Sequence, residues 1–114
     1  MRVQLTGARD EGMIALLLGS LDPGLRLAFD LSHPSWDGIE SQLVAAGAVR
    51  VNDLESGASF RYVRFRDPPY TDEELNEWAG KLRGRGEPVF VYFRHEDEPT
   101  APRYAQRLIE LLRA

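Results

Sequence analysis

The sequence contains no cysteine among its 114 residues. This excludes disulfides, iron–sulfur clusters, thiolate zinc sites and cysteine nucleophiles. Lysine is almost as scarce: Lys81 is the single lysine among 14 Lys and Arg residues, so Schiff-base chemistry is not expected. The GxxxxGKS/T, GxGxxG and GxSxG motifs are also missing, so nothing predicts a phosphate-binding loop or a nucleophile elbow. We expect neither a cofactor nor a metal.

Long apolar runs are missing as well. None approaches the roughly 20 residues that a membrane-spanning helix needs, and the first residues do not fit a signal peptide. We therefore expect a cytoplasmic protein with no membrane partner. A net charge of −4 and a pI near 5.2 argue against a nucleic-acid partner, because nucleic-acid-binding domains are normally basic. The length and the ordinary composition predict one globular domain over residues 1–114.

Five short segments alternate between aliphatic side chains and polar or aromatic ones, which is typical of β-strands. They are residues 2–5, 25–32, 49–53, 60–66 and 89–94. Strands joined by helices are normally parallel and apolar on both faces. Here the second face carries Gln4, Asp30, Asn52, Tyr62, Arg64, Tyr92 and Arg94. We predict an α/β fold of about five mostly parallel strands, with helices on one face and a polar lumen, ligand surface or partner interface on the other.

Four helices separate or follow these strands. The first is expected over residues 9–20, and the second after Ser35 or Trp36 and before Gly47. The third is expected from Thr71, where Glu74 completes a capping box, and the last from about Ala101. Their expected apolar stripes are Met13, Leu16, Leu17 and Leu21; Ile39, Leu43 and Ala46; Leu75, Trp78, Ala79 and Leu82; and Ala105, Leu108, Ile109 and Leu112.

Residues 54–59 are predicted to be a loop, so this connection between two strands lacks a helix. A parallel pair needs a crossover of about a dozen residues. The two strands therefore either follow a short irregular path or are not simple parallel neighbours.

Three segments, residues 27–36, 60–82 and 88–112, resemble the C-terminal half of the YecE-like TIM-barrel family, also known as domain of unknown function 72. Residues 3–6 and 49–53 fit the same order. The resemblance implies a truncated, half TIM-barrel-like sheet, since members of the family are longer and close an eight-stranded barrel. It also implies that much of the family's pocket lies in the missing half.

The residues that the resemblance places at the site depart from the family pattern. His33, Pro34, Ser35 and Trp36 are kept, whereas Asp30, Leu31 and Ser32 stand where the family favours Glu, Phe and Arg. Arg64 matches, but Arg66-Asp67 replaces a His-Gly pair, Arg94-His95 replaces tandem asparagines, and Tyr104 replaces an asparagine. The resemblance therefore implies a remodelled or degenerate site in a family without a known biochemical role.

Three arginines, Arg64, Arg66 and Arg94, are the candidate ligands for a small anion, because guanidinium groups bind phosphate and carboxylate. The alternative is that Arg64 pairs with Asp30. Trp36 and Tyr92, with Tyr62 and Phe90, form a stacking surface or simply fill the sheet. In an enzyme, Asp30 or His33 would act as the acid–base group.

A half barrel leaves unpaired strand edges, which are a liability in solution. We therefore expect a two-fold homodimer, or a complementary half-barrel chain as partner. The function expected is that of a non-catalytic or degenerate binding domain that self-associates. The alternative is an enzyme or binding protein for a phosphorylated or acidic metabolite. A nucleic-acid module is disfavoured by the acidic pI.

Overall fold

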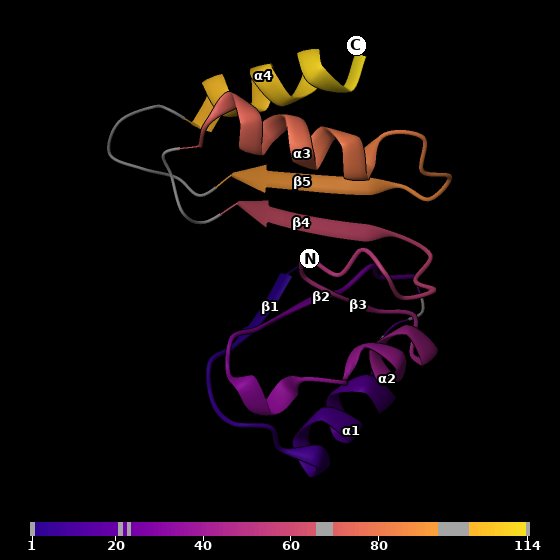
Figure 1. Cartoon of the computed structure of the whole chain (residues 1–114). Helices are drawn as coiled ribbons and strands as arrows, with labels where there is room; N and C mark the ends of the chain where they lie inside the picture. Colours follow the sequence, from indigo (N-terminus) through magenta and orange to yellow (C-terminus); the bar gives the residue numbers. More distant parts are fainter. Residues whose placement is uncertain (1, 21, 23, 66–69, 94–100, 114) are drawn as a thin grey trace. The chain divides into compact units, whose positions relative to one another are not determined.

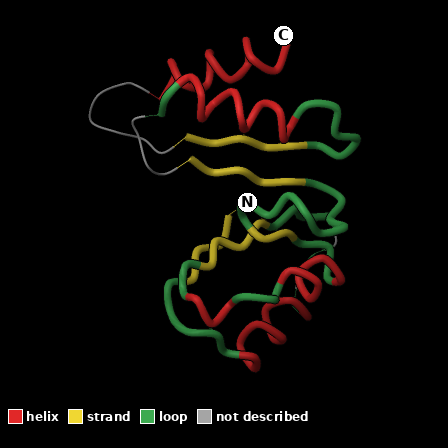
Figure 2. Tube along the Cα trace, in the orientation of Figure 1, coloured by secondary structure: helices red, strands yellow, loops and turns green. Residues whose placement is uncertain are grey.

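The computed structural model describes residues 2–20, 22, 24–65, 70–93 and 101–113 (Figures 1 and 2). The chain divides into two compact units, Met1–Tyr62 and Val63–Ala114. The elements follow the order β1 (Arg2–Leu5), α1 (Glu11–Gly19), β2 (Ala28–Leu31), the short 3₁₀ helix η1 (Pro34–Trp36), α2 (Glu40–Ala45), β3 (Val49–Arg50), β4 (Arg61–Phe65), α3 (Asp72–Leu82), β5 (Val89–Phe93) and α4 (Ala101–Arg113).

The first unit contains a parallel sheet with the strand order β1-β2-β3. Val3 lies opposite Phe29 in the register, and both belong to the parity that was predicted to be aliphatic. The aliphatic side chains of this face pack against α1, η1 and α2. The buried core cluster comprises Ile14, Leu27, Phe29, Leu31, Trp36, Ile39, Leu43 and Ala48. The alternation in the sequence therefore predicted the helix-covered face of this sheet correctly.

β3 is shorter than the predicted strand over residues 49–53. Its hydrogen bonding continues briefly, because the Val51 N–H donates to the Phe29 carbonyl at 2.9 Å. Asn52 then adopts a φ of 66°, the left-handed conformation that asparagine tolerates better than most residues and that ends an extended segment. Residues 54–59 form the predicted loop without a helix, and β3 and β4 belong to different sheets.

The apolar stripe predicted for α1 was wrong. Asp10 caps the helix, accepting the Met13 N–H at 2.9 Å, but Ile14 is the buried residue and Leu18 packs against the core. Leu16 is 75% exposed and Met13 and Leu17 are 37% exposed; Leu21 lies outside the described residues. The sequence of α1 is apolar almost all round, so periodicity alone could not select the inward face.

β4, whose residues 63–65 belong to the second unit, forms a two-stranded sheet with β5, and the two strands run side by side in the same direction (Figure 1). α4 packs against α3 and β5. The predicted capping box is present, because Thr71 Oγ1 accepts the Glu74 N–H at 3.1 Å. Leu75, Ala79 and Leu82 are buried as expected, whereas Trp78 is half-buried, with its ring 5.1 Å from that of Phe65.

The stripe predicted for α4 holds at Leu108, which is buried, but not at Ile109, which is 45% exposed. Adjacent residues point about 100° apart around a helix, so the two side chains do not share one inward direction. A further error is Ala46, predicted to face the core but exposed at the end of α2, where Gly47 with a φ of 81° terminates the helix.

The predicted class is confirmed: this is an α/β fold with parallel strands, and the five strands and four α-helices of the described residues follow the expected order. The described strands form two small sheets. No helix in the described part of the chain is long and apolar enough to span a membrane.

Candidate functional site

In parallel α/β folds, functional groups gather where strands end at their carboxyl side. In the first unit this rim is formed by the segments that follow β1, β2 and β3. Arg9 follows β1, His33 and Ser35 follow β2, and Asp53 follows β3. The polar groups of this rim are therefore the candidate site of the unit.

His33 caps the short helix η1. Its Nδ1 accepts the Ser35 N–H at 3.1 Å, and Ser35 Oγ lies 2.8 Å from the same nitrogen. Because Nδ1 acts as an acceptor, the neutral ring carries its proton on Nε2. Ser35 Oγ also accepts the Arg9 N–H at 2.7 Å. The predicted acid–base residue thus holds together the loops that follow β1 and β2, with Nε2 as the ring nitrogen outside this network.

Trp36, predicted as part of a stacking surface, is fully buried. Its Nε1–H donates to the Gly7 carbonyl at 2.9 Å, which ties η1 to the segment after β1. The indole therefore serves as core filler, the alternative that was open from the sequence. A stacking ligand would have to displace this packing.

Asp30, the second predicted acid–base residue, is 4% exposed on β2. Its carboxylate forms an ion pair with Arg2 of β1, with Arg2 Nη1 and Asp30 Oδ2 2.9 Å apart. An arginine partner was expected from the sequence, but Arg2 was not foreseen. A substrate would have to reach a carboxylate that is almost completely buried.

Two arginines missed by the sequence interpretation organise the rim. Arg50 donates from Nη1 to Glu40 Oε1 at 2.8 Å and from Nη2 to the Leu31 carbonyl at 3.1 Å. Arg61 is buried and donates to Ser56 Oγ at 3.2 Å and to the Ser56 carbonyl. Arg61 and the aliphatic Val63 are two residues apart on β4 and therefore lie on the same face of the strand. A charged residue on an otherwise apolar face is the sequence signal that would have identified Arg61 as a buried, paired residue.

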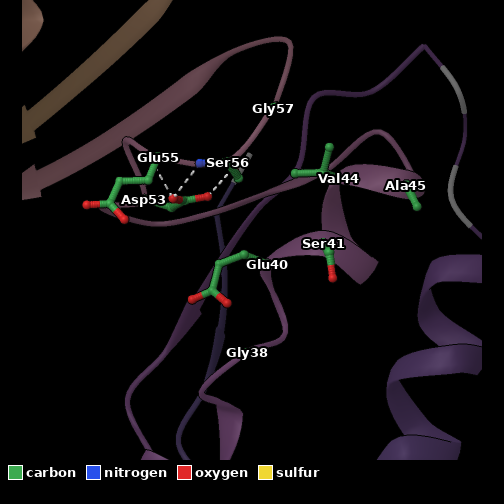
Figure 3. A pocket seen from close by; sticks show the side chains of 9 residues that line it. All are labelled: Gly38, Glu40, Ser41, Val44, Ala45, Asp53, Glu55, Ser56 and Gly57. Carbon is green, nitrogen blue, oxygen red and sulfur yellow. Dashed lines mark hydrogen bonds between the residues drawn. The ribbon is translucent and has the colours of Figure 1, made fainter.

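A pocket of about 720 Å³ opens beside α2 and the loop after β3 (Figure 3). It is lined by Gly38, Glu40, Ser41, Val44, Ala45, Asp53, Glu55, Ser56 and Gly57. Two of its three carboxylates have partners in the protein: Glu40 pairs with Arg50, and Asp53 lies 3.9 Å from Arg61. Among the described residues that line the pocket, three are acidic and none is basic, which does not favour an anionic metabolite here.

Asp53 is the best-defined ionisable group of this pocket. Its Oδ1 accepts the N–H groups of Glu55 at 3.0 Å and Ser56 at 3.2 Å, and Ser56 Oγ donates to Oδ2 (Figure 3). Burial opposes its charge and is the largest single influence, but these hydrogen bonds and the charge of Arg61 together lower the pKa of the Asp53 carboxyl. Asp53 is therefore a carboxylate that fixes its loop.

In the second unit, Arg64 is half-buried on β4 and Tyr92 is 46% exposed on β5. Arg66, Arg94 and His95 lie outside the described residues, so the anion site built from Arg64, Arg66 and Arg94 stays a prediction. In the parts of the chain that the structure describes, no three His, Asp or Glu side chains come together as a metal site requires.

Comparison with known proteins places this arrangement in a family. No curated protein matches the chain. A crystal structure of a DUF72 family protein from Enterococcus faecalis V583 shares its fold, with a TM-score of 0.79 at 14% sequence identity. The match covers 99% of this chain and 60% of that one, so the chain spans less than two thirds of the solved protein. The family model "Protein of unknown function DUF72" matches residues 4–114, and the chain belongs to this family.

Proposed function

We propose that this chain is a non-catalytic binding domain and that its binding partner is a second copy of itself. The observation that carries the proposal is the exposed apolar side of α1. Leu16 is 75% exposed at the middle of this helix, and Met13 and Leu17 are also exposed. A helix that is apolar all round is normally buried all round. A partner that covers α1 would restore that condition.

The rim supports a binding role over a catalytic one. His33 Nδ1 and Ser35 Oγ are engaged in capping η1, and Asp30 is buried against Arg2. General acid–base groups must reach one substrate position together. Groups that hold turns and strands in place are not arranged for that task.

One edge of the first sheet also supports association. In this chain β1 forms one edge of the three-stranded sheet, and sheet edges are sites where further strands or chains can add. Among the described residues, β1 is an edge strand and one side of α1 is exposed, and a partner that covers either would add stability.

Size-exclusion chromatography with light scattering over a concentration series tests the proposal. The monomer has a mass of 12.9 kDa, and we expect about twice this value at high concentration, falling on dilution. A constant monomer mass across the series, with native circular dichroism, would contradict self-association.

A further inference from the structure

We infer that the pocket beside α2 binds a small organic cation, with its charge against Glu55 and its hydrocarbon part against Val44. This binding goes beyond the proposed self-association and does not depend on it. The pocket has a volume of about 720 Å³, and small-molecule sites typically measure roughly 300–1,000 Å³. It also lies beside the loop that leaves the carboxyl end of β3, and parallel α/β folds usually bind their ligands at that end of the strands.

Both walls of this pocket are held in place by the protein itself. One wall is α2, which begins at Glu40. The other is the loop after β3, where Asp53 Oδ1 accepts the N–H groups of Glu55 at 3.0 Å and Ser56 at 3.2 Å. The buried guanidinium of Arg61 donates to the Ser56 carbonyl and anchors this loop to β4. A ligand therefore meets a preformed pocket and does not have to order its walls.

The charges around the pocket leave one carboxylate for a ligand. Glu40 pairs with Arg50 at 2.8 Å, and Asp53 lies 3.9 Å from Arg61. Within the described part of the chain, Glu55 has no ion-pair partner and no basic side chain lines the pocket. Three carboxylates with two paired guanidinium groups amount to one net negative charge. The pocket therefore suits a ligand with a single positive charge.

The arrangement of the lining side chains favours an organic cation over a metal ion. Among the described residues, no three His, Asp or Glu side chains come close enough together to hold a metal. Figure 3 shows Val44 and Ala45 on one side of the pocket, away from the carboxylates of Glu40, Asp53 and Glu55. A pocket with a charged side and an apolar side matches an alkylammonium ion, whose ammonium group and hydrocarbon chain can contact the two sides at once.

The exposure of the lining sets the strength of binding. Glu55 and Ala45 are exposed and Val44 is half-buried, so a bound ligand keeps part of its surface in water. An ion pair at such a site contributes little, and we expect about a threefold preference for the cation over a neutral compound of the same size. The dissociation constant is accordingly expected in the millimolar range, so the test must detect weak binding.

An NMR titration of the whole ¹⁵N-labelled chain at constant ionic strength is the first test. The probes are n-butylammonium, n-butanol and butyrate, which are similar in size and differ in charge. We expect n-butylammonium to shift the amide signals of Val44, Glu55 and Ser56 saturably, n-butanol to bind about threefold more weakly, and butyrate not to bind. Equal affinity for n-butylammonium and n-butanol, or no saturable shift of these signals, would overturn the site.

Two matched variants separate the site from the general attraction of a chain with a net charge of −4. Glu55→Gln removes the unpaired carboxylate and should weaken n-butylammonium about threefold, to the affinity of n-butanol. Glu73→Gln removes an exposed carboxylate from α3 and should leave the affinity unchanged. An unchanged affinity in Glu55→Gln, or an equal loss in both variants, would overturn the assignment of the charge contact to Glu55.

Discussion

The buried network around Asp53 yields the sharpest quantitative prediction. In Asp53→Ala the guanidinium of Arg61 loses its carboxylate partner while both side chains are less than 10% exposed in the wild type. Removing one member of a buried ion pair destabilises by about 3–5 kcal/mol. The lower end applies here, because the two charges are 3.9 Å apart and Arg61 keeps the Ser56 carbonyl as an acceptor. We expect a loss of about 3 kcal/mol in the free energy of unfolding of the first unit.

The chain contains one tryptophan in each unit, Trp36 and Trp78. In a Trp78→Phe background, urea unfolding followed by fluorescence therefore reports the first unit alone. Asp72→Ala is the control, because it removes a surface carboxylate paired with Arg107, and it is expected to leave the Trp36 midpoint unchanged. A loss below about 1 kcal/mol for Asp53→Ala would refute the buried network as a source of stability.

Further predictions concern pH and two local conformations. Folding lowers the pKa of the Asp53 carboxyl from 3.8. The stabilisation that its carboxylate provides is therefore complete above pH 3.8 and is lost as the pH falls through the lower pKa of the folded state. Asp53→Asn should flatten the acid side of a curve of unfolding free energy against pH, and an unchanged acid side would contradict this. Thr71→Ala removes the cap of α3 and should cost about 1 kcal/mol, measured by urea unfolding with Trp78 as reporter, whereas Thr71→Ser should restore most of it. Gly47→Ala places a Cβ atom on a residue with a φ of 81° and should destabilise the first unit by about 1–2 kcal/mol. Thermal denaturation tests this, with Gly57→Ala as the control because Gly57 has no positive φ and a Cβ there meets no atom within 4 Å.

Local signals explain which parts of the fold could be predicted from the sequence. The capping box of α3 and the alternation of β2 act through hydrogen bonds and strand geometry within a few residues, so the sequence contains them directly. The shortened β3 depends on the conformation of Asn52. Asparagine permits that conformation without requiring it, so the end of the strand was not predictable.

The candidate site was harder to predict because its partners are distant in the sequence. Arg2 and Asp30 are 28 residues apart, and Arg50 reaches Glu40 and the Leu31 carbonyl across two connections. Pairing of this kind is decided by strand order and register. The sequence identified Asp30 and His33 as polar groups at strand ends, but not that one would be buried by an ion pair and the other would cap a turn.

The error over α1 and the proposal about its partner have one physical cause. Periodicity selects the inward side of a helix from the position of its polar residues, and between Gly12 and Gly19 there are no charged ones. With Leu16 and Leu18 on opposite sides, the sequence cannot say which side meets the core. The same property makes the helix suited to burial on both sides. If the exposed side of α1 around Leu16 is a contact between two copies, Leu16→Glu should lower the solution mass from that of a dimer to that of a monomer. If this side is ordinary solvent-exposed surface, Leu16→Glu should change neither the solution mass nor the free energy of unfolding.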